Sequence, residues 1–154
     1  MVERKSVFVI STVRNASRVD EEALKEYKQK LLNKDYDVYI PNFDTKQEGD
    51  PIGLRICSDN AEAMLKSDEI HVFYNPESQG VHYDIGQYNM MCKLGVKKPI
   101  VFVNSNDFEI KDHKDFSNCL HFLDEFYRNG GFYPEKSVFK GMKLPNFYNK
   151  FRKI

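Results

Sequence analysis

Apolar and polar positions alternate along this chain in two different rhythms. Four short apolar runs have the length and composition of buried strands: residues 6–11, 36–40, 69–74 and 99–103. Four other segments carry apolar residues at helical spacing: residues 19–33, 54–66, 82–94 and 116–127. Strands that alternate with helices predict a three-layer α/β sandwich of the flavodoxin-like (Rossmann-like) type, with a mostly parallel sheet between helices.

Polar loops follow the predicted strands. Residues 12–18 follow the first strand and lead into a helix, and residues 75–80 follow the third strand and do the same. The segment 43–53, which comes after Pro41 ends the second strand, is rich in Gly, Pro and Asp and is a candidate lid. Ligands of open parallel sheets collect beyond the carboxyl ends of the strands, so these loops are where chemistry is expected.

Length and composition predict one domain. A chain of 154 residues with 41% hydrophobic residues is long enough for one core, and we expect a single domain over residues 1–154. Its end, residues 132–154, mixes Phe and Tyr with Lys and Arg. This segment is interpreted as a strap across its own core or a partner subunit. A nucleic-acid contact is the alternative interpretation.

Charge and hydropathy narrow the class of protein. Lys and Arg total 23 and Asp and Glu total 23, so there is no overall attraction toward nucleic acid or an anionic membrane. No apolar stretch approaches the ~20 residues that span a bilayer, and the first residues do not form an export signal. The three cysteines form no zinc-binding pattern. We therefore expect a cytoplasmic protein with mostly buried, reduced thiols, no metal and no cofactor.

The loop after the first strand has the donors of an anion site. Thr12, Arg14 and Asn15 provide a hydroxyl, a guanidinium and an amide beside the start of a helix. Backbone amides and the helix dipole favour an anion at such a place, and arginine binds phosphate with two hydrogen bonds. The alternative is that Ser17 caps the helix and the arginines are only solvated.

The loop after the third strand adds a carboxylate. Ser78 and the amides around Gly80 are candidates for holding a phosphate, and Gly86 is expected to let the helix approach the sheet or a ligand closely. Asp84 is expected near the first turn, where the amides would keep it ionised and able to react with a sugar carbon. The alternative is that Asp84 only complements the helix dipole.

Three further polar residues have simpler interpretations. Asp59 is expected on the preceding helix, where a solvated carboxylate is the plain alternative to a role in chemistry. Asp68 is expected to cap or end that helix. His82 is the one histidine that falls among the candidate residues, where it narrows a pocket or offers a proton, and a purely steric role is the alternative.

Five segments occur in a recognisable order: residues 11–14 (STVR), 39–41 (YIP), 59 with 66–70 (KSDEI), 80–86 (GVHYDIG) and 94–100 (LGVKKPI). Over roughly the first two-thirds of the chain, this order resembles the nucleoside 2-deoxyribosyltransferase superfamily. The segments 12–14 and 78–86 are most similar to the branch of 2′-deoxynucleoside 5′-phosphate N-hydrolases, whose loops bind a 5′-phosphate.

The resemblance implies a mechanism and an assembly. It implies that Asp84 attacks C1′ of the sugar and expels the base, and that Asp59 places or protonates that base. The general logic is that of a retaining glycosidase, with two carboxyl groups about 5–5.5 Å apart. It also implies a homo-oligomer, expected to be a dimer, in which a hydroxyl such as that of Ser117 contacts the phosphate across the interface.

Two departures keep other functions open. The family nucleophile is normally Glu, whereas this chain has Asp84, and a small residue is usual where it has His82. Loss of one methylene withdraws the carboxylate, and a misplacement of about 1 Å costs on the order of a hundredfold in rate. Hydrolysis of a nucleoside 5′-monophosphate is the preferred hypothesis. Transfer of deoxyribose between bases, and nucleotide binding without turnover, are the alternatives.

Overall fold

The computed structural model describes residues 4–104, 115–120 and 123, which belong to two units, residues 1–104 and 105–154. The strands of the first unit are β1 (Ser6–Ile10), β2 (Asp37–Tyr39), β3 (Glu69–Val72) and β4 (Ile100–Phe102). Its helices are α1 (Arg18–Leu32), α2 (Pro41–Asp44), α3 (Leu54–Lys66) and α4 (Gln79–Lys93). Strands and helices thus alternate as the sequence pattern predicts.

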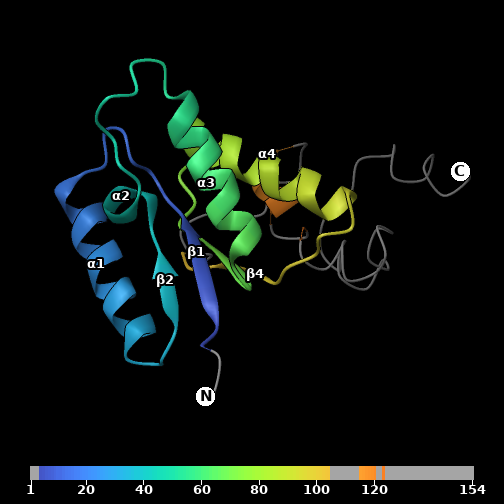
Figure 1. Ribbon diagram of the computed structural model, residues 1–154, viewed down its shortest axis with the longest axis horizontal. Coiled ribbons are helices and arrows are strands. Elements are labelled where there is room, and N and C mark those ends of the chain that lie inside the picture. Colours follow the sequence, from blue (N-terminus) through green and yellow to red (C-terminus); the bar gives the residue numbers. More distant parts are fainter. Residues whose placement is uncertain (1–3, 105–114, 121–122, 124–154) are drawn as a thin grey trace, which may run out of the picture. The chain divides into compact units, whose positions relative to one another are not determined.

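The four strands form one parallel sheet in the order β2-β1-β3-β4 (Figure 1). Val7 pairs with Val38 on one side of β1, and Phe8 pairs with Ile70 on the other. The chain moves one way from β1 to β2 and the opposite way from β2 through β3 to β4. Because crossovers between parallel strands are right-handed, α1 covers one face and α3 and α4 cover the other. The fold is therefore the predicted α/β sandwich with a flavodoxin-like strand order.

The first face of the sheet packs against α1. Val7 and Val9 point to this side and form a core with Leu24 and Leu31. The helix begins where Ser17 accepts a hydrogen bond from the Asp20 amide, while the Asp20 carboxylate accepts one from the Ser17 amide. This capping box satisfies two amides that no helical carbonyl reaches. Capping by Ser17, one of the two interpretations of this loop, is thus confirmed.

The second face of the sheet is also buried. Phe8 and Ile10 alternate with the valines of β1 and are fully buried. Helices α3 and α4 pack against β1 and against each other. Met64 of α3 and Tyr88 of α4 are also fully buried, and the Tyr88 hydroxyl donates to the Lys98 carbonyl at 2.7 Å. Burial on both faces explains why the strands are continuous apolar runs.

The structure corrects two predicted boundaries. The short helix α2 lies partly within the segment expected to be a loop, because Pro41 occupies its first turn, where no amide hydrogen bond is needed. Helix α4 begins at Gln79 instead of residue 82, because the Ser78 hydroxyl caps it by accepting from the Val81 amide. This earlier start changes the environment of every later residue of α4.

The candidate lid is bonded to α3. The Asp50 carboxylate accepts hydrogen bonds from the amides of Gly53 and Ile56, at the start of the helix. The Arg55 guanidinium donates to the carbonyls of Lys46 and Glu48. In this structure the segment is therefore fastened to the helix that follows it.

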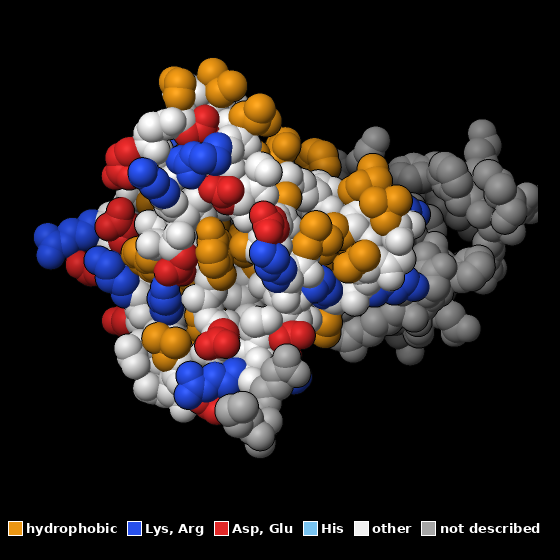
Figure 2. Space-filling model, in the orientation of Figure 1, with side chains coloured by type: hydrophobic (Ala, Val, Ile, Leu, Met, Phe, Trp, Pro, Cys, Tyr) orange, Lys and Arg blue, Asp and Glu red, His pale blue; other side chains and the backbone are white. Residues whose placement is uncertain are grey.

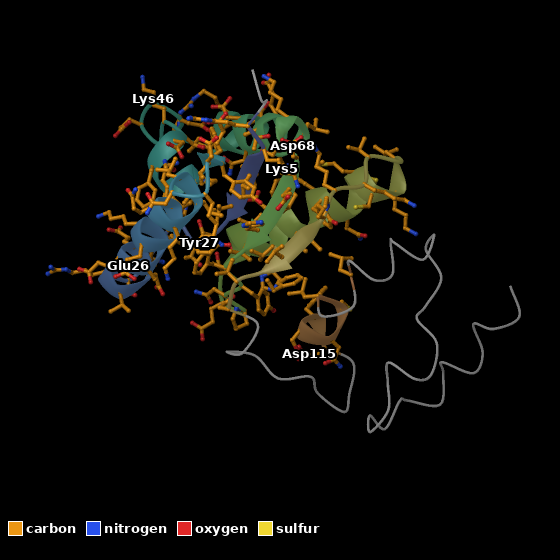
Figure 3. The ribbon with its side chains drawn as sticks, turned by 90° about the horizontal axis from the view of Figure 1, so that it is seen from below. Lys5, Glu26, Tyr27, Lys46, Asp68 and Asp115 are labelled. Atoms are coloured by element: carbon orange, nitrogen blue, oxygen red, sulfur yellow. The ribbon has the colours of Figure 1, made fainter. Side chains whose placement is uncertain are left out.

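Polar side chains connect Tyr27 of α1, through the buried His71 of β3, to the exposed Lys5, and Figure 3 labels the two ends, Tyr27 and Lys5. The Tyr27 hydroxyl is 2.9 Å from His71 Nδ1, and His71 Nε2 is 3.3 Å from the Glu69 carboxylate, which also pairs with Lys5 at 3.0 Å. Burial lowers the pKa of His71, and the neighbouring Glu69 carboxylate opposes that change. His71 is thus an ordinary core histidine with both nitrogens partnered.

Asp68 has a different role from the one predicted. Its carboxylate accepts hydrogen bonds from the amide and hydroxyl of Ser6, at 2.7 and 2.8 Å, and thereby fixes the start of β1. The C-cap of α3 is Ser67, whose hydroxyl donates to the Ala63 carbonyl. The prediction that Asp68 caps the helix is wrong because its side chain turns toward the neighbouring strand.

In the second unit, residues 116–120 are helical, within the helix predicted at 116–127. The predicted strap at 132–154 lies outside the described residues. None of the described helices has the length and hydropathy to cross a membrane. Cys92 is buried, Cys57 is half-buried and Cys119 is exposed, and all three are free thiols, so the expectation of mostly buried thiols fails for Cys119.

Candidate active site

The two candidate loops leave neighbouring strands at the same edge of the sheet. The β1–α1 loop follows Ile10 and the β3–α4 loop follows Val72, and these two residues are paired in register. Strand order reverses between β1 and β3, since β2 lies beyond β1 and β4 lies beyond β3. The crevice outside such a reversal is the usual ligand site of this class of fold. The structure therefore brings the two predicted donor loops together.

Asp84 is the most unusual side chain of this region. It is the sixth residue of α4, only 6% of it is exposed, and no hydrogen bond or ion pair to any described residue satisfies its carboxyl group. Burial alone raises its pKa to about 7 from the ordinary 3.8. A carboxyl group that is buried without a partner is energetically unfavourable when ionised, so its presence calls for a functional explanation.

The expectation that helix amides keep Asp84 ionised is wrong. Because α4 begins at Gln79, Asp84 lies beyond the first turn, where the amides already bond to helical carbonyls. Desolvation dominates instead and favours the neutral acid. The same observation excludes the plain alternative that Asp84 serves to complement the helix dipole.

Asp84 belongs to a stripe along α4. Gly80, Asp84 and Gln87 are spaced four and three residues apart, so they project from the same side of the helix. The Gln87 side-chain oxygen is buried and has no hydrogen-bond donor in the part of the chain that the structure describes. Sequence reasoning overlooked Gln87. The helical spacing was a signal for it, but its missing partner is evident only in three dimensions.

The start of α4 offers donors to an anion. The Ser78 oxygen already accepts from the Val81 amide, which leaves its hydroxyl hydrogen to donate. A Cβ added at Gly80 would meet nothing closer than the Ser78 hydroxyl at 4.0 Å, so there is open space in front of Gly80. Both features fit a ligand at this helix terminus.

His82 faces away from Asp84. Its Nδ1 is 2.8 Å from the Ser78 carbonyl oxygen, and its ring packs edge-on against Tyr74. Residues two apart on a helix point to nearly opposite sides, so His82 and Asp84 do not share one surface of α4. The structure therefore gives His82 the contacts of a packing residue.

Gly86 does not have its predicted role. It is exposed, and a Cβ built there would meet no atom within 4 Å. The expectation that it permits close approach to the sheet is wrong, because position 86 lies on the outer side of α4, away from the stripe of Asp84. The expected approach of a ligand stays a prediction.

The β1–α1 loop presents an unpaired guanidinium. Arg14 is exposed and makes no ion pair with the described residues, and its Nη2 lies 3.6 Å from the place a Cβ would take at Gly53. Asn15 has a left-handed backbone, with a φ of 59°, which turns the loop here. Thr12 is half-buried, and its carbonyl accepts from Asn42. Arg14 is thus available to an anion.

Asp59 and Asp84 have different surroundings. Its carboxylate pairs with Arg55 at 3.0 Å, and its side chain is 42% exposed. It also lines a groove of about 340 Å³ with Tyr39 and Lys66, and Asp84 is not part of that lining. The inward polar residue of α3 is instead Asn60, which is buried and accepts a hydrogen bond from the Thr45 hydroxyl at 2.9 Å. No described contact links the two acids.

Ser117 belongs to the second unit, where its hydroxyl donates to the Asp115 carboxylate at 2.6 Å. Across the described residues, no three His, Cys, Asp or Glu side chains gather in a way that could hold a metal ion. Comparison of the sequence with models of protein families and with curated proteins gives no match.

Proposed function

We propose that this chain hydrolyses the N-glycosidic bond of nucleoside 5′-monophosphates, with 2′-deoxynucleotides as the first candidates, through the carboxylate of Asp84. The observation that carries the proposal is that Asp84, on the helix that leaves the β1/β3 crevice, is buried without a partner among the described residues. The resemblance of residues 12–14 and 78–86 to nucleotide N-hydrolases supports the same chemistry.

The burial of Asp84 suits a nucleophile that meets positive charge. Cleavage of a glycosidic bond passes through an oxocarbenium-like transition state. A carboxylate with no competing hydrogen bonds, in a site of low dielectric, stabilises that charge strongly. The Asp84 carboxylate would thus interact most favourably when the sugar becomes cationic. An interaction that is stronger in the transition state than in the bound substrate is what catalysis requires.

The proposed reaction has two steps. An oxygen of the Asp84 carboxylate forms a bond to C1′ while the bond from C1′ to the base nitrogen breaks and its electron pair leaves with the base, which takes a proton from solvent. Water then attacks C1′, the ester bond to Asp84 breaks, and the proton of that water passes to solvent. The products are free base and sugar 5-phosphate. Asp59 has no part in this scheme, because its carboxylate is half-exposed and paired with Arg55.

The phosphate has donors from both loops. The Ser78 hydroxyl and the amides at the start of α4 would bind it from one side, and the Arg14 guanidinium from the other. Thr12 and Asn15 would complete the first loop. This preference for a phosphate favours hydrolysis of nucleotides over exchange of bases between nucleosides.

The assembly and location of the protein are further parts of the proposal. Large apolar side chains are exposed on α3 and α4, among them Leu54, Leu65, Tyr83 and Met90. Figure 2 shows hydrophobic side chains on the surface of the molecule. Such an exposed set supports a homodimer, and the resemblance suggests that each site is shared between subunits. A cytoplasmic protein that acts on a small nucleotide, and not on nucleic acid, agrees with the neutral charge balance.

Release of free base tests the proposal. Wild type and Asp84→Asn are incubated with a panel of ribo- and deoxynucleoside monophosphates, and bases are separated by chromatography. We expect release by wild type and a loss of at least a thousandfold in Asp84→Asn, while Asp59→Asn retains activity. No release by wild type, or equal release by Asp84→Asn, would refute the function. A new nucleoside formed after addition of a second base would indicate a transferase.

A further inference from the structure

We propose that Gln87 reads the nucleobase, and that the base it selects carries an amino group beside a ring nitrogen, as adenine does. This inference rests on the proposed function, since it places a nucleotide along α4. It goes beyond that function by assigning base recognition to a residue outside the motifs of the resemblance.

The stripe has the order of the parts of a nucleotide. Gly80, at the start of α4, is beside the phosphate donors, Asp84 follows after about 6 Å of helix and Gln87 after about 4.5 Å more, at 1.5 Å per residue. With the phosphate at the helix start and C1′ at Asp84, the group that continues past C1′ in the same direction is the base. Gln87 is thus the next side chain that the ligand meets.

The side-chain oxygen of Gln87 lacks the partner that its burial requires, although the residue as a whole is only half-buried. Its oxygen is buried without a donor, and none of the described residues makes a hydrogen bond with either end of the amide. An orphaned buried acceptor costs about 1–3 kcal/mol. Native structures satisfy nearly all such groups, so an orphan beside a proposed site indicates that a ligand supplies the missing donor.

A carboxamide offers one acceptor and one donor side by side. Glutamine pairs in this way with adenine, accepting from the exocyclic amino group and donating to the adjacent ring nitrogen. The match does not depend on which end of the amide is oxygen, since the side chain turns over to suit the base. Bases without an N–H on this edge would leave the Gln87 oxygen unpaired and be rejected.

The test asks whether a preference for the 6-amino group of the base depends on Gln87. Wild type, Gln87→Met and the control Gln29→Met are compared on 2′-deoxyadenosine 5′-monophosphate and on its purine analogue without the 6-amino group. Met keeps the length of Gln and removes its hydrogen bonds. Gln29 is an exposed glutamine of α1 that bonds to Asn33, remote in the fold from the stripe. Both kcat/KM and, by calorimetry, Kd are recorded.

We expect wild type and Gln29→Met to prefer the amino-bearing nucleotide about tenfold or more, and Gln87→Met to lose that preference by binding the first nucleotide less well. An equal effect of Gln87→Met on both nucleotides, or none on either, would overturn the inference and leave base release intact. Binding with this preference but without turnover would overturn the proposed function and retain the inference. If wild type binds neither nucleotide, both are overturned.

Discussion

Asp84 and Gln87 lie three residues apart on the same side of α4, and each buries a polar group that no described residue satisfies. Core polar groups are ordinarily paired, as Thr45 and Asn60 are in this same protein. Asp84, a buried acid with no described partner, and the orphaned oxygen of Gln87 follow each other on the helix that leaves the β1/β3 crevice, and this sets the surface apart from the rest of the described core.

The burial of Asp84 predicts a stability gain on its removal. Its folded pKa is about 7 against the ordinary 3.8, so the folded protein favours the neutral acid. The contribution of Asp84 to the free energy of unfolding is fully present below about pH 4, where the acid is neutral in both states. It is lost as the pH rises toward 7, because the unfolded chain ionises more readily. Asp84→Asn should therefore raise the free energy of unfolding at pH 8 by up to about 4 kcal/mol and change little at pH 4. Urea unfolding at both pH values measures it, with Asp59→Asn as the exposed control. A destabilised Asp84→Asn at pH 8 contradicts the assignment.

The same pKa predicts the pH dependence of catalysis. Since the nucleophile must be ionised, kcat/KM should fall about tenfold per pH unit below pH 7 and level off above it. Asp59→Asn should preserve the profile. A rate that is greatest near pH 5 would show that the protonated acid is the active form.

Removal of the orphaned carboxamide should also stabilise the protein. Gln87→Met removes the buried oxygen that lacks a donor and keeps a side chain of the same length. We therefore expect the free energy of unfolding without ligand to rise by about 1 kcal/mol. Gln29→Met, on the surface of α1, should change stability by less than about 0.5 kcal/mol. Loss of stability in Gln87→Met would mean that the amide already has a structural partner.

Arg14, whose guanidinium makes no ion pair with the described residues, is predicted to bind phosphate, so its replacement should cause a selective loss of affinity for phosphate. Arg14→Gln should raise KM for a nucleoside 5′-monophosphate by about ten- to a hundredfold, because a charge-assisted contact is lost, and should leave the unphosphorylated nucleoside unaffected. Arg18→Gln is the matched control, since Arg18 pairs with Glu22 on the solvent side of α1. Equal effects on nucleotide and nucleoside would assign Arg14 a structural role.

The fold and part of the site could be predicted from sequence, for identifiable reasons. Continuous apolar strands alternating with amphipathic helices specify the sandwich, and the loops with Arg14 and Ser78 follow from strand ends. Short α2 was missed because Pro41 reads equally as the end of a strand and as the first residue of a helix. That ambiguity is resolved only by tertiary packing.

The environment of each acid could not be predicted. Asp59 and Asn60 are adjacent, and the rotation of α3 about its own axis decides which of them is buried. That rotation is set by contacts of α3 with the sheet, which no local pattern records. Likewise the ionisation of Asp84 depends on where α4 begins. Because the helix begins three residues earlier than predicted, Asp84 lies beyond the free amides of the first turn, and burial raises its pKa.

The stereochemistry of the product tests most directly whether Asp84 attacks the sugar. With methanol as acceptor and a 2′-deoxynucleoside 5′-monophosphate as substrate, nuclear magnetic resonance identifies the anomer of the methyl glycoside formed. Two displacements at C1′, the first by Asp84, predict that the β configuration of the substrate is retained. Inversion to the α anomer would show that the acceptor attacks C1′ directly and would contradict a covalent role for Asp84.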